Sequence, residues 1–136
     1  MALTIGRAAR AAGVNVETIR FYERRGLIEQ PPKPNGWAYR EYPSETVSRI
    51  RFIRKARALG FSLREISDLL TLASTATADC GDVRVRATAK IEDVSRKIAE
   101  LTRVRTALET LVGACPGGGT PLNRCSVLDA LADVPA

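Results

Sequence analysis

The sequence contains no histidine, which removes the commonest general base and the commonest metal ligand of proteins. Catalytic triads and dyads that depend on an imidazole are therefore excluded. The chain also lacks clustered carboxylates, and Gly117–Gly119 do not follow a predicted strand, as a phosphate-binding loop would. Its 136 residues are enough for one compact domain, or for a small domain with an extension. We therefore expect a protein that is not an enzyme and uses no organic cofactor.

Long hydrophobic runs are absent as well. No apolar run approaches the length of about 20 residues that a membrane-spanning helix requires, and the N-terminus lacks the pattern of a signal peptide. We expect a cytoplasmic protein with no membrane partner. Thiols are reduced in that compartment, and three cysteines cannot form a closed set of disulfides within one chain. Metal binding and redox sensing are therefore the favoured roles of the cysteines.

The positive charge is unevenly distributed along the chain. Residues 1–57 hold 12 Lys and Arg against 5 Asp and Glu, whereas residues 58–136 hold 9 against 10. The net charge of +6 therefore comes from the first part of the chain. This asymmetry favours nucleic-acid binding at one end of the protein and a different role at the other.

The basic part begins with the pattern of a helix-turn-helix. Thr4 and Asn15 are the predicted N-caps of two short helices, and Gly13 and Gly26 are predicted to end them. A small β-hairpin, or wing, is expected next. Three prolines exclude a helix there, and Asn35-Gly36 is a strong signal for a hairpin turn.

The strands of this hairpin are predicted at residues 27–29 and 37–42. Two more helices should then complete a DNA-binding domain of residues 1–74. Ser44 is the predicted N-cap of the first, and the second opens with a capping box, Ser62-Leu63-Arg64-Glu65. A polar hinge of residues 75–80 follows.

Residues 81–113 are predicted to form a long dimerisation helix. Apolar residues recur every seven positions for about four repeats, which is the pattern of a coiled coil. Nothing else in the chain is long enough to cover a stripe of roughly 48 Å, so we predict a homodimer in which a second copy supplies the partner helix. The seam positions are Ala87, Val94, Leu101 and Leu108 in one series, and Ile91, Ile98, Arg105 and Val112 in the other, with Val104 beside the charged position.

A basic winged helix-turn-helix is an architecture that reads DNA. Its second helix enters the major groove, and flanking cations neutralise phosphates. A small helical domain with a solvated basic surface is the alternative interpretation. The candidate DNA contacts are Thr18, Arg20 and Tyr22 on the second helix, Tyr39 and Arg40 in the wing, and Arg57 near the end of the third helix.

The three cysteines flank the long helix. Cys80 precedes it, Cys115 follows it, and Cys125 lies beyond a Gly/Pro loop. In a straight helix, Cys80 and Cys115 of one chain would be ~50 Å apart. In an antiparallel dimer, Cys80 of one subunit would instead meet Cys115 and Cys125 of the other.

Three thiolates without an imidazole make a soft site. Zinc prefers four ligands, so this donor set favours a large soft ion such as Hg(II) or Pb(II). Two alternatives stay open at this point. The cysteines could be small buried hydrophobes, or they could form a thiol redox switch.

The segments TIGRAARAAGVNVETIRFYERRGLI, GWAYREY and RIRFIRKARALGFSLREISDLL resemble the MerR family of bacterial transcription regulators, over residues 3–72. The three-cysteine layout resembles its mercuric-ion-responsive members in particular. The resemblance implies a mainly α-helical homodimer with a winged helix-turn-helix, an antiparallel coiled coil and a metal-binding loop with a short helix at residues 114–136. It also implies binding to double-stranded promoter DNA and RNA polymerase, repression without metal, and activation with metal by distortion of the promoter spacer.

The resemblance extends to single residues. Arg20, Tyr22, Tyr39, Arg40 and Arg57 match DNA contacts of the family, and Cys80, Cys115 and Cys125 match its mercury ligands, the first donated across the dimer. The expected effector is Hg(II), with Pb(II) or Cd(II) as alternatives. The zinc type is disfavoured because it adds a histidine, and the copper type because it usually replaces the first cysteine. The wing and the cysteine loop each look one residue longer than the family pattern.

Overall fold

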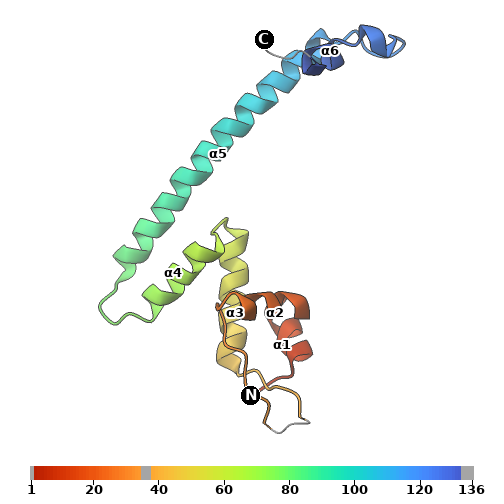
Figure 1. Ribbon diagram of the computed structural model, residues 1–136. Helices are drawn as coiled ribbons and strands as arrows, with labels where there is room; N and C mark the ends of the chain where they lie inside the picture. Colours follow the sequence, from red (N-terminus) through yellow and green to blue (C-terminus); the bar gives the residue numbers. More distant parts are fainter. Residues whose placement is uncertain (1, 35–37, 133–136) are drawn as a thin grey trace. The chain divides into compact units, whose positions relative to one another are not determined.

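The computed structural model describes residues 2–34 and 38–132, and apart from one isolated β-bridge their regular structure is helical (Figure 1). The mainly α-helical fold class is confirmed. The chain divides into two compact units, residues 1–87 and 88–136. The helices are α1 Ile5–Ala12, α2 Val16–Arg24, α3 Ser44–Ala58, α4 Leu63–Ala73, α5 Cys80–Ala114, the 3-10 helix η1 Leu122–Arg124 and α6 Ser126–Ala132.

The helices α1 and α2 form the predicted helix-turn-helix. Gly13 ends α1 in the left-handed conformation, with a φ angle of 76°, which favours glycine. The Asn15 side chain begins α2 by accepting a hydrogen bond of 2.8 Å from the Thr18 N–H. Thr4 occupies the N-cap position of α1, but its side chain makes no capping hydrogen bond.

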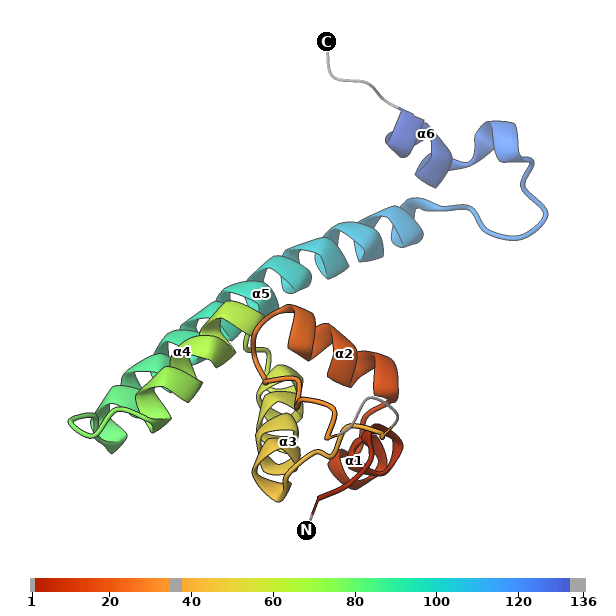
Figure 2. The ribbon, with the colours of Figure 1, turned by 60° about the horizontal axis from the view of Figure 1, so that its bottom comes forward.

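The helices α3 and α4 follow the predicted order, and α3 contacts both α1 and α4 (Figure 2). The predicted capping box of α4 is confirmed, because the Ser62 N–H donates to Glu65 Oε1 over 2.7 Å and the Glu65 N–H donates to Ser62 Oγ over 3.1 Å. The predicted cap of α3 is wrong by one position. Ser44 is the first helical residue, and Pro43 occupies the N-cap position.

One apolar core holds the first unit together. Each of α2, α3 and α4 contributes at least one fully buried isoleucine. The helix α1 contributes small side chains, which let the neighbouring helices approach closely. The buried core residues are Ala8, Ala9, Ala12, Ile19, Tyr22, Leu27, Ile28, Tyr42, Val47, Ile50, Ile53, Ala56 and Ile66.

The two strands predicted for the wing are not found in the described residues. Leu27 and Ile28 are buried in the core without strand pairing, and residues 35–37, which include the predicted turn, lie outside the described residues. Tyr42 pairs instead with Leu3, through two backbone hydrogen bonds of 2.6 and 2.9 Å. A turn signal is local, whereas a strand needs a pairing partner, and Tyr42 finds its partner near the N-terminus.

The helix α5 begins one residue earlier than predicted, at Cys80, and ends at Ala114. A reciprocal cap explains this start. The Asp79 N–H donates to Asp82 Oδ2 over 2.9 Å, and the Asp82 N–H donates to Asp79 Oδ1 over 3.2 Å. The helix is 35 residues long, so its rise amounts to about 52 Å.

Candidate DNA interface and cysteine site

Three of the six predicted DNA contacts line one surface hollow of the first unit. Thr18, Tyr22 and Arg57 surround a volume of about 500 Å³, together with Phe21 and Arg24. The two arginines come from different helices, α2 and α3, and both are exposed. Glu17 also lines the hollow, but its carboxylate is paired with Arg20 at 2.9 Å, which leaves Arg24 and Arg57 as the cations that can meet an anionic group.

Tyr22 is less accessible than the pattern along α2 predicted. It is 5% exposed and belongs to the core, with its ring centroid 6.1 Å from that of Phe21. Contact with a ligand is therefore restricted to the part of the side chain that lines the hollow. Arg24, an exposed cation at the same place, was not among the predicted contacts, although its position in the last turn of a basic helix was a usable signal.

The other three predicted contacts line a second hollow. Arg20, Tyr39 and Arg40 surround a volume of about 240 Å³. Lys33 lines it with them, although it was not among the predicted contacts. The Arg40 Nε atom is buried there and has no hydrogen-bond partner among the described residues. An unpaired buried donor costs free energy, and the cations Arg20, Lys33 and Arg40 suit this hollow to an anion, although the Glu23 carboxylate also lines it.

A tyrosine–carboxylate hydrogen bond fixes the wall of the second hollow. Tyr42 Oη donates to Glu23 Oε2 over 2.6 Å, which ties the segment before α3 to α2. Burial raises the pKa of the Tyr42 hydroxyl, and the hydrogen bond and the charge of Glu23 raise it further. The tyrosine therefore stays protonated and continues to donate. No local signal could have revealed this pair, because the two residues are 19 positions apart.

Two arginines of α3, Arg51 and Arg54, contact the end of α1. The Arg51 guanidinium donates two hydrogen bonds to the Ala11 carbonyl oxygen, over 2.8 and 3.0 Å. Arg54 lies against Gly13, where an added Cβ would be 3.2 Å from Arg54 Cζ. Both cations sit at the carboxyl end of α1, where the helix dipole favours positive charge.

The three cysteines are free thiols associated with the ends of α5. Cys80 is its exposed first residue, half-buried Cys115 follows its last residue, and half-buried Cys125 precedes α6. Within residues 2–34 and 38–132, no group of three Cys, Asp or Glu side chains of one chain forms a metal site. A single chain thus does not gather the predicted cysteine ligands.

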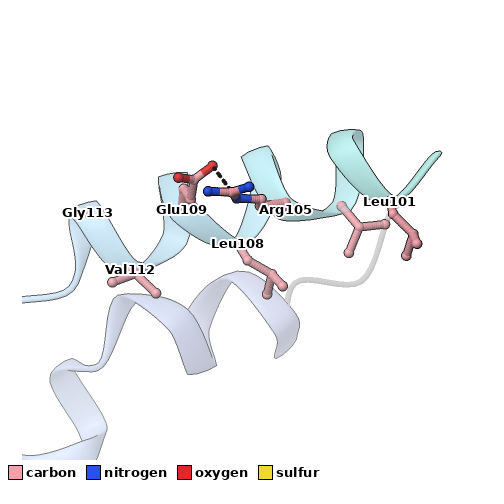
Figure 3. Close-up of a pocket in the computed structure, with 7 residues that line it drawn as sticks. Leu101, Arg105, Leu108, Glu109, Val112 and Gly113 are labelled. Carbon is pink, nitrogen blue, oxygen red and sulfur yellow. Dashed lines mark ion pairs between the residues drawn. The ribbon is translucent and has the colours of Figure 1, made fainter. Parts of the chain in front are cut away.

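The second unit exposes an apolar groove on α5. Leu101, Val104, Leu108 and Val112 line a volume of about 650 Å³ (Figure 3). Arg105, the charged residue of the predicted seam, lies 3.9 Å from Glu109 in an ion pair. Leu101 remains 67% exposed and Val112 69%. The predicted heptad seam is therefore an uncovered stripe in the isolated chain.

Comparisons with known proteins give matches to two family descriptions and to curated relatives. Residues 3–72 match the family described as MerR HTH family regulatory protein, and residues 47–111 match the one described as MerR, DNA binding. A mercuric resistance operon regulatory protein of Serratia marcescens is 49% identical over 113 residues, which cover 83% of this chain and 76% of that protein.

Two solved structures extend the similarity to the fold. The transcription regulator PbrR691 from Ralstonia metallidurans CH34, in complex with lead(II), has a TM-score of 0.82 at 33% identity and covers 96% of this chain and 99% of its own. The dual-function transcriptional regulator MerR of Bacillus megaterium MB1, in complex with mercury(II), has a TM-score of 0.74 at 37% identity and covers 96% and 100%.

None of the described helices combines the length and the apolar character that a membrane span requires. The relatives and structural neighbours are transcription regulators, which confirms the prediction that the chain is not an enzyme. The chain belongs to the MerR family of helix-turn-helix transcription regulators.

Proposed function

We propose that this regulator binds promoter DNA as a homodimer and takes Hg(II) as its effector, at a site made by Cys80 of one subunit and Cys115 and Cys125 of the other. One observation carries the proposal: the three thiols of a histidine-free chain flank the two ends of α5. The similarity to a mercuric resistance operon regulatory protein and to a mercury(II)-bound regulator supports the choice of ion.

The uncovered stripe of α5 supports the homodimer. A single helix cannot bury such a stripe, and a second copy of the same helix matches it in length and pattern. In an antiparallel pair, the start of α5 in one subunit lies beside its end in the other. This arrangement would bring Cys80 to the partner's Cys115 and Cys125, and would create two sites per dimer.

The donor set fits a soft ion. Three sulfurs without nitrogen ligands suit Hg(II) better than zinc, which prefers four ligands. When bound, the ion would supply strong bonds to thiolates from both subunits, without redox chemistry. Pb(II) is the second candidate, because a lead(II)-bound regulator is among the similar structures, and Cd(II) is the third.

The two hollows support DNA binding by the first unit. In the proposed complex α2 enters the major groove, and Arg20, Arg40 and Arg57 contact phosphates on either side of it. We propose repression without metal and activation with metal, through distortion of the promoter spacer between elements that RNA polymerase recognises. In this mechanism the dimer has two conformations, and the effector shifts the equilibrium between them. The promoter DNA is deformed in only one of the two.

The effector is tested by titrating the reduced protein with Hg(II), Pb(II) and Cd(II). Sulfur-to-metal charge-transfer absorption and transcription from the operator promoter are followed together. We expect Hg(II) to activate at the lowest concentration. Activation by Pb(II) or Cd(II) at a lower concentration would overturn the metal assignment, and switching by peroxide without metal would indicate a thiol redox sensor.

Removing a cation from the second hollow should reduce the salt dependence of DNA binding. Each lost phosphate contact lowers the slope of log K against log salt by about 0.9, and a dimer loses two contacts, so Lys33→Ala and Arg40→Ala should each lower it by about 1.8. Arg103→Ala is the matched control, since it removes an exposed arginine from α5. Binding isotherms at several salt concentrations measure the slopes, and equal slopes in all three variants would exclude the second hollow from the interface.

A further inference from the structure

An ion pair joins α4 to the first two turns of α5. Arg86 Nε donates to Asp68 Oδ2 over 2.5 Å, so a side-chain contact connects the two helices. The Arg86 hydrogen bond lowers the pKa of the Asp68 carboxyl, and the Asp68 hydrogen bond and charge, with the charge of Asp82, raise the pKa of the guanidinium. Asp82 therefore acts on the same arginine as Asp68, from one helical turn earlier in α5.

Asp82 also forms the reciprocal cap with Asp79, and Cys80 and Gly81 lie between these two residues in the chain. A side chain at Gly81 would displace the Asp79 carboxylate from this cap, because an added Cβ would lie 2.9 Å from Asp79 Oδ1. The first turn of α5, which carries Cys80, is thus capped by Asp79 and Asp82 and connected through Arg86 to Asp68 on α4.

We propose that Asp68, Arg86 and Asp82 are positioning residues for the Cys80 thiol. They hold the first turn of α5 against α4, so that the Cys80 thiol keeps one position. Binding of an effector to this thiol then acts through α4 on the DNA-binding unit. The inference rests on the proposed role of Cys80 as a metal ligand. Its physical basis is preorganisation, because a ligand on a fraying helix end must be ordered at the moment of binding.

The position of Cys80 makes this support necessary. Its side chain is exposed, and it stands at a helix terminus, where fraying is common. Asp68 belongs to α4, whose Ile66 and Leu69 are buried, so this anchor stands on a well-packed helix. The ion pair therefore connects an exposed ligand to the rigid part of the unit.

The test compares Arg86→Ala, Asp68→Ala, their double variant and Arg86→Lys with the wild-type full-length dimer. A partly exposed ion pair allows an increase of about two- to fivefold in the Hg(II) concentration for half-maximal activation. The double variant should be no worse than either single variant, since both remove the same interaction. Arg86→Lys should retain most of the response.

Two readouts separate positioning from general loss of stability. At Hg(II) concentrations below saturation, the charge-transfer absorption of the thiolate-bound ion should be weaker in Arg86→Ala, while operator affinity without metal stays unchanged. Arg96→Ala is the matched control, because Arg96 is an exposed α5 arginine that pairs with Asp93 on its own helix. Ser62→Ala, which removes the α4 cap, should lower the melting temperature without changing the absorption.

The outcomes distinguish the inference from the proposed function. A wild-type dimer that responds to Hg(II), together with Arg86→Ala and Asp68→Ala variants that behave like Arg96→Ala, would overturn the positioning role alone. A wild-type dimer without any Hg(II) response would overturn the proposed function and the inference with it.

Discussion

Replacing Cys80 by serine should abolish activation by Hg(II) while leaving the repressor able to bind its operator. The substitution removes one of three proposed sulfur ligands, and a serine hydroxyl is a poor ligand for a soft ion. The loss of affinity should exceed about 100-fold, which is the upper range for losing a mere outer-shell partner of a metal site. Equilibrium competition for Hg(II) and transcription assays measure the two effects. A Cys80→Ser protein with an intact response would contradict the three-sulfur site.

Mixed dimers test whether the ligands come from two subunits. Cys80→Ser subunits are combined with subunits that carry both Cys115→Ser and Cys125→Ser, neither of which responds alone. In a shared arrangement, the mixed dimer contains one complete site, because the first subunit supplies Cys115 and Cys125 and the second supplies Cys80. A site within one chain predicts no recovery at all. Restored activation in the mixture therefore distinguishes the two arrangements directly.

The features that sequence could predict are those determined by neighbouring residues. The left-handed Gly13, the Asn15 cap and the Ser62–Glu65 capping box each depend on atoms within one helical turn. Their residue types have few other uses at that spacing, so the end of α1 and the starts of α2 and α4 followed.

The features that sequence could not predict depend on partners far along the chain. Tyr22 was expected on the surface of α2, but the core formed by α1, α2 and α3 takes in its ring. Tyr42 was expected to pair within a hairpin, but it pairs with Leu3 and donates to Glu23. Periodicity shows that a face is apolar, and only packing decides which boundary residues that face includes.

The candidate metal site has features of both kinds, those that neighbouring residues determine and those that depend on residues far along the chain. Residue types and spacing predict a soft ligand set of three cysteines, and the structure places Cys80 at the first residue of α5 rather than before it. Sequence gave no sign that Asp79 and Asp82 cap this turn or that Arg86 reaches Asp68, because each carboxylate has an equally acceptable role as a solvated charge. In the proposed site the three thiols come together only in a dimer. Their meeting therefore depends on the α5 stripe, through which the two subunits are proposed to pair.

Introducing a charge into that stripe should therefore disable the whole protein. Leu108→Glu removes a side chain whose burial contributes about 1.5–3 kcal/mol, and the dimer loses it twice. A loss of about 3–6 kcal/mol corresponds to a roughly 10²- to 10⁴-fold weaker dimer, since each 1.4 kcal/mol is tenfold. Sedimentation equilibrium measures the dimer, and operator binding at the same concentrations measures its consequence.

The matched control for this change is Arg103→Glu, which introduces the same carboxylate at the outermost heptad position, five residues earlier on α5. It should remain dimeric and responsive. A Leu108→Glu protein that stays dimeric would show that the stripe is not the subunit interface. If the variant is monomeric, operator affinity and Hg(II) binding should fail together, because two-fold DNA recognition and the shared cysteine site both require the same antiparallel pair of helices.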